Sequence, residues 1–143
     1  MEIKISRISA ILLTACITLT QLPYVFAVIK QTDWIPLSAV IIPLELVAAI
    51  GILMSAFYLK KSLIVISVVF LLLVSVDLYT SFFGFVEFLN PFAETKYYKI
   101  VPVSPETIRF PNRDLTGLFV AVLASLVVIS SKIWVNRITK GSN

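Results

Sequence analysis

Two apolar runs separated by a pair of lysines decide the fold: PLSAVIIPLELVAAIGILMSAFYL at residues 36–59 and SLIVISVVFLLLVSVDLYTSFFG at residues 62–84. Each run exceeds the ~20 apolar residues that carry an α-helix across ~30 Å of hydrocarbon. A helix satisfies its own backbone hydrogen bonds in lipid, which an open strand does not. We therefore expect two transmembrane helices joined by a tight turn at Lys60 and Lys61.

Two further apolar runs, at residues 8–29 and 115–135, complete the pattern. The chain of 143 residues is 59% hydrophobic and 14% charged, whereas soluble domains carry ~25% charged residues. The sequence predicts an all-α integral membrane four-helix bundle, one transmembrane domain whose first partner is the lipid bilayer. A stretch similar to a signal-peptidase site, Val25-Phe26-Ala27, leaves cleavage of the first segment as an alternative.

A long external loop at residues 85–114 separates the third and fourth helices. Its four prolines forbid one continuous helix. We expect residues 85–92 to form a short interfacial helix and residues 100–112 to be extended. Asn112 or Asp114 can cap the fourth helix, because short polar side chains accept hydrogen bonds from the first free N–H groups.

Lysine and arginine predict the orientation. With four spans, one face holds both termini and the turn at residues 60–61, with seven basic residues: Lys4, Arg7, Lys60, Lys61, Lys132, Arg137 and Lys140. The other face holds five, four of them in the long loop, where the positive-inside rule is weak. Both termini are therefore expected in the cytoplasm, and the bacterial inner membrane is the expected location.

The sequence lacks the residues that several kinds of site require. The chain has no histidine and one cysteine, Cys16, so it lacks the usual haem and copper ligands and cannot form an internal disulfide. We therefore expect no metal and no cofactor. No clustered basic face suggests nucleic acid as a partner, and no nucleophile–base–acid set or phosphate-binding loop favours an enzyme.

Three polar residues lie inside the apolar runs: Gln21, Glu45 and Asp77. Counted from the outer ends of their helices, all three lie ~10–14 Å deep, at ~1.5 Å per residue. A charge at such a depth costs roughly 2.5–3.5 kcal/mol or more, so these side chains should face the bundle interior. The sequence predicts one intramembrane polar layer near the outer face, with Lys30 as a possible ion-pair partner of Glu45.

Two interpretations of this layer remain open. The first is a pocket that opens outwards and handles a proton, a small polar molecule or a quinone head group. The second is a buried hydrogen-bond cluster that only holds the helices together.

Small residues predict close helix packing. They occur at four-residue spacing on the second and fourth helices: Gly51 and Ser55, then Gly117, Ala121 and Ser125. Such spacing lets two backbones approach closely. We favour packing inside the bundle over packing between copies of the chain.

The run Ile42-Pro43-Leu44-Glu45-Leu46, followed by AIGILM at residues 49–54, resembles the second helix of DoxX-type and MauE-type four-helix membrane proteins. Lys30 resembles the lysine that ends their first helix, and residues 112–115 resemble the start of the last helix of the MauE type. That type often carries a cysteine pair where this chain has residues 81–84, SFFG. The resemblance implies maturation of partner proteins or a small subunit linked to quinone chemistry.

These observations favour an accessory or maturation protein that acts with a membrane partner or as a homo-oligomer. Two alternatives use the same polar layer: a small subunit of a quinone-linked oxidoreductase, and a small carrier or channel.

The charge asymmetry makes a testable prediction about topology. A tag after Asn143 and a tag at Lys60 should both be cytoplasmic, while a tag near Thr95 should be external, because the basic residues hold the first two sites inside. Side-specific labelling in intact cells measures this. Labelling of Thr95 and Asn143 from the same side would contradict the four-span arrangement.

Overall fold

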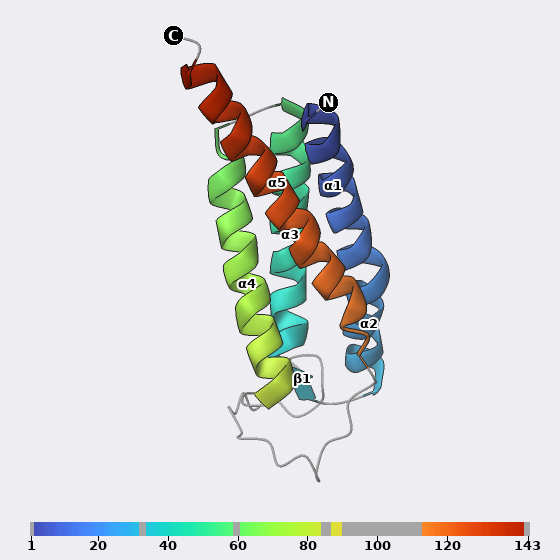
Figure 1. Cartoon of the computed structure of the whole chain (residues 1–143). Helices are drawn as coiled ribbons and strands as arrows, with labels where there is room; N and C mark the ends of the chain where they lie inside the picture. The colour runs from blue at the N-terminus through green and yellow to red at the C-terminus, as the bar shows by residue number, and fades with distance from the viewer. Residues whose placement is uncertain (1, 32–33, 59–60, 84–86, 90–112, 142–143) are drawn as a thin grey trace.

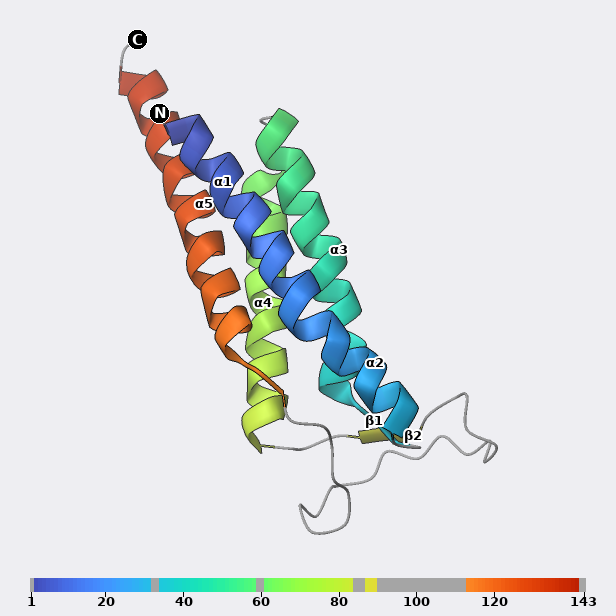
Figure 2. The ribbon, with the colours of Figure 1, turned by 90° about the vertical axis from the view of Figure 1, so that its right-hand side faces the viewer.

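The computed structural model describes residues 2–31, 34–58, 61–83, 87–89 and 113–141. Their elements follow in chain order: α1 (Glu2–Cys16), the π-helical turn η1 (Ile17–Gln21), α2 (Leu22–Gln31), β1 (Trp34–Pro36), α3 (Leu37–Tyr58), α4 (Leu63–Phe83), β2 (Glu87–Leu89) and α5 (Thr116–Gly141). The first three form one rod (Figure 2).

Four of these helical stretches are long and apolar enough to cross a membrane: Lys4–Lys30, Leu37–Tyr58, Leu63–Ser81 and Thr116–Ile138. This confirms the predicted number and order of apolar helices, with ends that differ by a few residues. The two largest differences are at the chain ends, where α1 begins at Glu2 instead of residue 8 and α5 continues to Gly141 instead of ending at residue 135. Polar and basic residues follow there, and a helix that leaves the apolar layer can carry them.

The helices form a ring in which neighbours run antiparallel (Figure 1). The most extensive packing is between α1 and α5 and between α3 and α4, and contacts of α1 with α3 and of α4 with α5 close the ring. Both termini lie at one end of the bundle, and β1 lies at the other (Figure 1). One end of the bundle therefore carries the chain termini, and the other carries β1.

The expected interfacial helix at residues 85–92 is wrong where the structure describes this segment. Glu87–Leu89 form β2, which pairs antiparallel with β1 in the register Trp34–Leu89, Ile35–Phe88 and Pro36–Glu87. Pairing satisfies backbone groups that the short link between α2 and α3 leaves without helical partners. Residues 85, 86, 90–92 and 100–112 lie outside the described residues.

The outer surface of the bundle is apolar on all four helices, whereas its interior is mixed. Leu19, Val47 and Val65 are 64–73% exposed, while polar side chains such as Ser67 and Ser125 are buried. A soluble bundle has the reverse arrangement, with a polar surface and an apolar core. Such a surface suits a lipid environment.

The small residues of the predicted stripes face inwards. Gly117, Ala121 and Ser125 are buried on α5, and a Cβ atom at Gly51 would meet Cγ2 of Ile66 on α4 at 3.3 Å. Ser55 is buried, and its hydroxyl lies 3.3 Å from that of Ser62 across the turn between α3 and α4. These positions support packing inside the bundle.

Gly117 on α5 lies very close to Thr20 in η1. A Cβ atom at Gly117 would lie 2.6 Å from the Cβ of Thr20 and would overlap the rest of that side chain as well. Because the Thr20 Cβ is fixed to the backbone, no rotamer removes the overlap. Gly117→Ala should therefore lower the free energy of unfolding in detergent by ~1–3 kcal/mol.

Gly141→Ala is the matched control, because a Cβ atom there meets nothing within 4 Å. It should be neutral or slightly stabilising, since alanine favours helix over glycine by up to ~1 kcal/mol. Equal stability of the two variants would show that η1 and α5 do not approach this closely.

Candidate functional site

Gln21, Glu45 and Asp77 are each fully buried, with 0% exposure, and come from η1, α3 and α4. Each lies on the inward face of its helix. On α3, Ile42, Ala49 and Ile52 share the buried face of Glu45 at helical spacing. The structure thus brings the three predicted residues into the bundle interior.

A fourth residue, Arg113, joins two of them. Its Nη1 donates to Oδ1 of Asp77 at 2.7 Å and its Nη2 to Oδ2 at 2.5 Å, so the salt bridge is bidentate. Its Nε donates to Oε1 of Gln21 at 2.8 Å, and its Nη1 also donates to the Ser81 hydroxyl at 2.6 Å. The guanidinium lies over the ring of Tyr24, 5.3 Å from its centroid. Planar, forked donors of this kind are why arginine suits buried carboxylates.

Gln21 connects the ion pair to the backbone. While its oxygen accepts from Arg113, its Nε2 donates to the carbonyl of Asp114 at 2.8 Å and to the hydroxyl of Thr20 at 3.0 Å. One amide thus holds both the Arg113 side chain and the main chain just before α5. A carboxylate at this position would lack the donor, and an apolar residue would leave both partners unsatisfied.

The π-helical turn orients Gln21. Pro23 has no N–H, so the carbonyl four residues earlier loses its usual donor. The chain widens locally, and the N–H of Leu22 donates to the carbonyl of Ile17, five residues back. The Thr20 hydroxyl donates to the Cys16 carbonyl in the same turn. Single π-helical turns occur often at functional sites.

Glu45 is the unusual member of the site. Neither of its carboxylate oxygens accepts a hydrogen bond from a donor group among the described residues, and the carboxyl group lies close enough to Asp77 for the two to share a proton. It lies close enough to Asp77 and Arg113 to interact electrostatically with both. An unpartnered carboxylate in an apolar interior costs several kcal/mol, so Glu45 must carry a proton or meet water or a ligand there.

Charge balance shows what the arrangement can do chemically. Arg113 supplies one positive charge, and its bidentate pair with Asp77 neutralises it. Glu45 is then a second carboxyl group beside a pair that is already balanced. One proton or one small cation would restore neutrality.

Asp114 caps α5, as one of the two predicted residues, while Asn112 lies outside the described residues. Its Oδ1 accepts from the N–H of Thr116 at 2.9 Å. Hydrogen bonds from the backbone and side chain of Thr116 lower the pKa of this exposed carboxyl group. The cap fixes the start of α5 directly after Arg113.

The expected pairing of Lys30 with Glu45 does not form, because the oxygens of Glu45 have no partner within the described part of the chain. Lys30 is exposed in the last turn of α2, where its ammonium group can stay hydrated. Arg113 is the basic residue at the polar layer. Its position in the sequence had assigned it to the external loop at residues 85–114, so its place in the layer was not predicted. A buried carboxyl group needs a counter-charge, and a basic residue at the start of the facing helix was the available signal.

The chain matches no protein-family model, no curated protein and no solved structure. Among the residues with described positions, no three His, Cys, Asp or Glu side chains gather closely enough to hold a metal ion.

The ion pair makes a testable prediction. Asp77→Asn and Arg113→Gln should each lower the free energy of unfolding by ~3–5 kcal/mol, because each leaves one buried charge uncompensated. The loss of free energy of unfolding in the double variant should be clearly smaller than the sum of the two single losses, since the double variant removes both charges. Unfolding in mixed micelles measures the free energies of the parent, the two single variants and the double variant, which together form a double-mutant cycle.

Arg113→Lys is the matched control for charge alone. It keeps the positive charge but cannot form the bidentate pair and reach Gln21 at the same time. Its free energy of unfolding should lie between those of the parent and of Arg113→Gln. Additive losses in the double variant would mean that the two side chains do not interact.

Proposed function

We propose that this chain is an integral membrane protein of the bacterial inner membrane with both termini in the cytoplasm. Four long apolar helices, an apolar outer surface and the basic residues at one end support this placement. In this orientation the polar centre formed by Gln21, Glu45, Asp77 and Arg113 lies in the outer half of the membrane.

We further propose that the centre works by taking up and releasing one proton at Glu45. The observation that carries this proposal is a fully buried carboxyl group that receives no hydrogen bond from a donor in the described structure and lies beside Asp77 and its balanced ion pair. Gln21 has a fixed hydrogen-bond partner for both its oxygen and its nitrogen, whereas Glu45 has no fixed donor and depends on a proton to be satisfied. Intramembrane carboxyl groups of this kind commonly mark proton or ion pathways.

The role that fits such a centre best is that of an accessory or maturation protein acting with a membrane partner. The resemblance of residues 42–54 to DoxX-type and MauE-type proteins supports this proposal. A quinone-linked subunit is the second candidate, because a carboxylic acid beside an arginine can donate a hydrogen bond to a quinone oxygen and supply its proton.

What co-purifies in mild detergent separates these roles. A partner that carries haem, flavin or an iron–sulfur cluster favours the quinone-linked subunit, while a partner without a redox group favours maturation. Ion flux across liposomes that contain this protein alone favours a carrier or channel.

Glu45→Gln tests the proton site. In liposomes, infrared spectroscopy of the parent should show a carboxylic-acid C=O band that shifts in D2O and is absent from the variant. Because glutamine is isosteric, the free energy of unfolding should change by only ~1–2 kcal/mol. Loss of the band without loss of the fold is the expected result.

Asp114→Asn is the control, because that carboxyl group is exposed and lies outside the spans. It should leave the band unchanged. A band that is present but does not shift in D2O would show a sealed structural cluster. A band that survives Glu45→Gln would place the proton elsewhere.

A further inference from the structure

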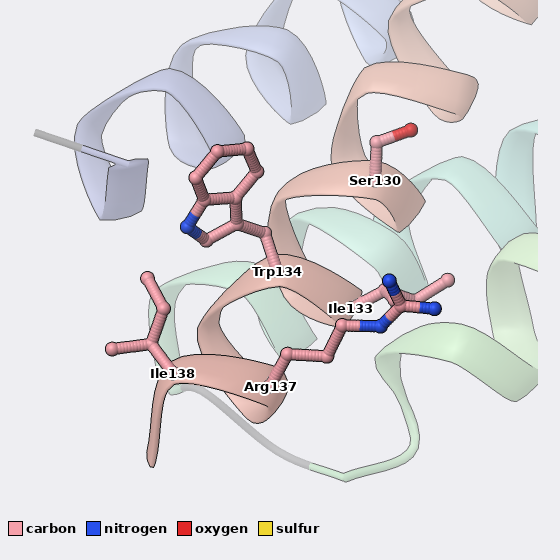
Figure 3. Close-up of a pocket in the computed structure, with 5 residues that line it drawn as sticks. All are labelled: Ser130, Ile133, Trp134, Arg137 and Ile138. Atoms are coloured by element: carbon pink, nitrogen blue, oxygen red, sulfur yellow. The ribbon is translucent and has the colours of Figure 1, made fainter. Parts of the chain in front are cut away.

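The last turns of α5 form a surface hollow of ≈ 440 Å³ at the end of the bundle opposite the polar centre. Its walls come from Ser130, Ile133, Trp134, Arg137 and Ile138 (Figure 3). A second hollow of ≈ 390 Å³ adjoins it, shares Ser130 and Trp134, and continues along the same helix to Leu123. Together they form one groove, which we name the α5 groove.

The length of the α5 groove along the helix matches the thickness of one membrane leaflet. From Leu123 to Ile138 it follows 15 residues, or ~22 Å at ~1.5 Å per residue. A leaflet is ~20–22 Å deep when its headgroups are included. The groove begins about a third of the way along the span Thr116–Ile138 and ends where that span ends. The groove is thus long enough for one lipid molecule, from the end of its acyl chain to its headgroup.

The indole and the guanidinium of the α5 groove lie at the headgroup end, while the hydroxyl groups of Ser130 and Ser131 in its middle donate to carbonyls of the same helix. Trp134, 60% exposed, is at the depth where interfacial tryptophans gather. Arg137 lies one turn further out, and its guanidinium has no hydrogen-bond or ion-pair partner within the described residues. An unpaired guanidinium above an apolar groove fits a phosphate group, which it can bind through two parallel hydrogen bonds.

The surrounding charge selects an anionic lipid. Seven basic residues and one acidic residue, Glu2, belong to this end of the chain's four-span arrangement. Each basic residue near an anionic membrane surface adds attraction. A zwitterionic lipid would offer its phosphate but would also bring a cationic group into this field.

We propose that the α5 groove is a binding site for one anionic phospholipid of the cytoplasmic leaflet, with its phosphate on Arg137 and an acyl chain along Leu126, Val127 and Ser130. The inference rests on the proposed membrane insertion and orientation but not on the polar centre. A second copy of the chain or an apolar helix of another protein would use the apolar wall. Neither accounts for an unpaired arginine at phosphate depth.

Trp134 reports occupancy of the site directly. The chain has two tryptophans, so Trp34→Phe leaves Trp134 as the only indole. In nanodiscs of phosphatidylcholine, a small fraction of phosphatidylglycerol with brominated chains should quench Trp134 about fivefold more strongly than the same fraction of brominated phosphatidylcholine. Arg137→Gln, made in this background, should abolish the preference.

Lys140→Gln is the matched control, because it removes an exposed charge from the same end of α5 without touching the groove. It should keep the preference. Equal quenching by both lipids in the parent, or a preference that survives Arg137→Gln, would overturn the site while leaving membrane insertion intact. Quenching by neither lipid would overturn it differently, by showing Trp134 covered by protein or outside the bilayer.

Discussion

The buried pair of Arg113 and Asp77 is the interaction on which the outer half of the bundle depends. Apolar helices in lipid gain little from the hydrophobic effect when they associate, so packing and polar contacts must specify their register. A bidentate pair defines both distance and angle between the start of α5 and the end of α4. Gln21 extends this control to η1. Three of the four helices are thus held at one point, at the end where the chain makes its longest connection.

Such a pair is costly to bury, which bears on why it is present. Replacing a buried ion pair with apolar residues often leaves stability unchanged or increases it. A sequence this rich in aliphatic residues could have filled the space with leucine or valine. The charges are therefore better explained by a requirement for polarity beside Glu45. Arg113 and Asp77 provide a fixed field in which one additional carboxyl group changes the net charge of the centre.

The helix α5 connects two ends with different chemistry. Its first residues follow Arg113 and the cap at Asp114, while its last turns carry Trp134 and Arg137. Between them, Gly117 packs against Thr20, the residue before Gln21. The polar centre and the α5 groove therefore lie at opposite ends of the same helix.

The sequence by itself determined the number, order and apolar character of the helices, because uninterrupted apolar runs of this length have one stable form in lipid. It also placed Gln21, Glu45 and Asp77 at a common depth, since rise per residue converts chain position into depth. It did not identify Arg113 as their partner, because the pairing joins residues 36 positions apart through the crossing of α4 and α5. Only the tertiary structure decided that Lys30 stays at the surface, that Gln21 meets Arg113, and that residues 87–89 form a strand. These outcomes depend on which groups meet in three dimensions, and a helix period or a hydropathy run contains no information about that.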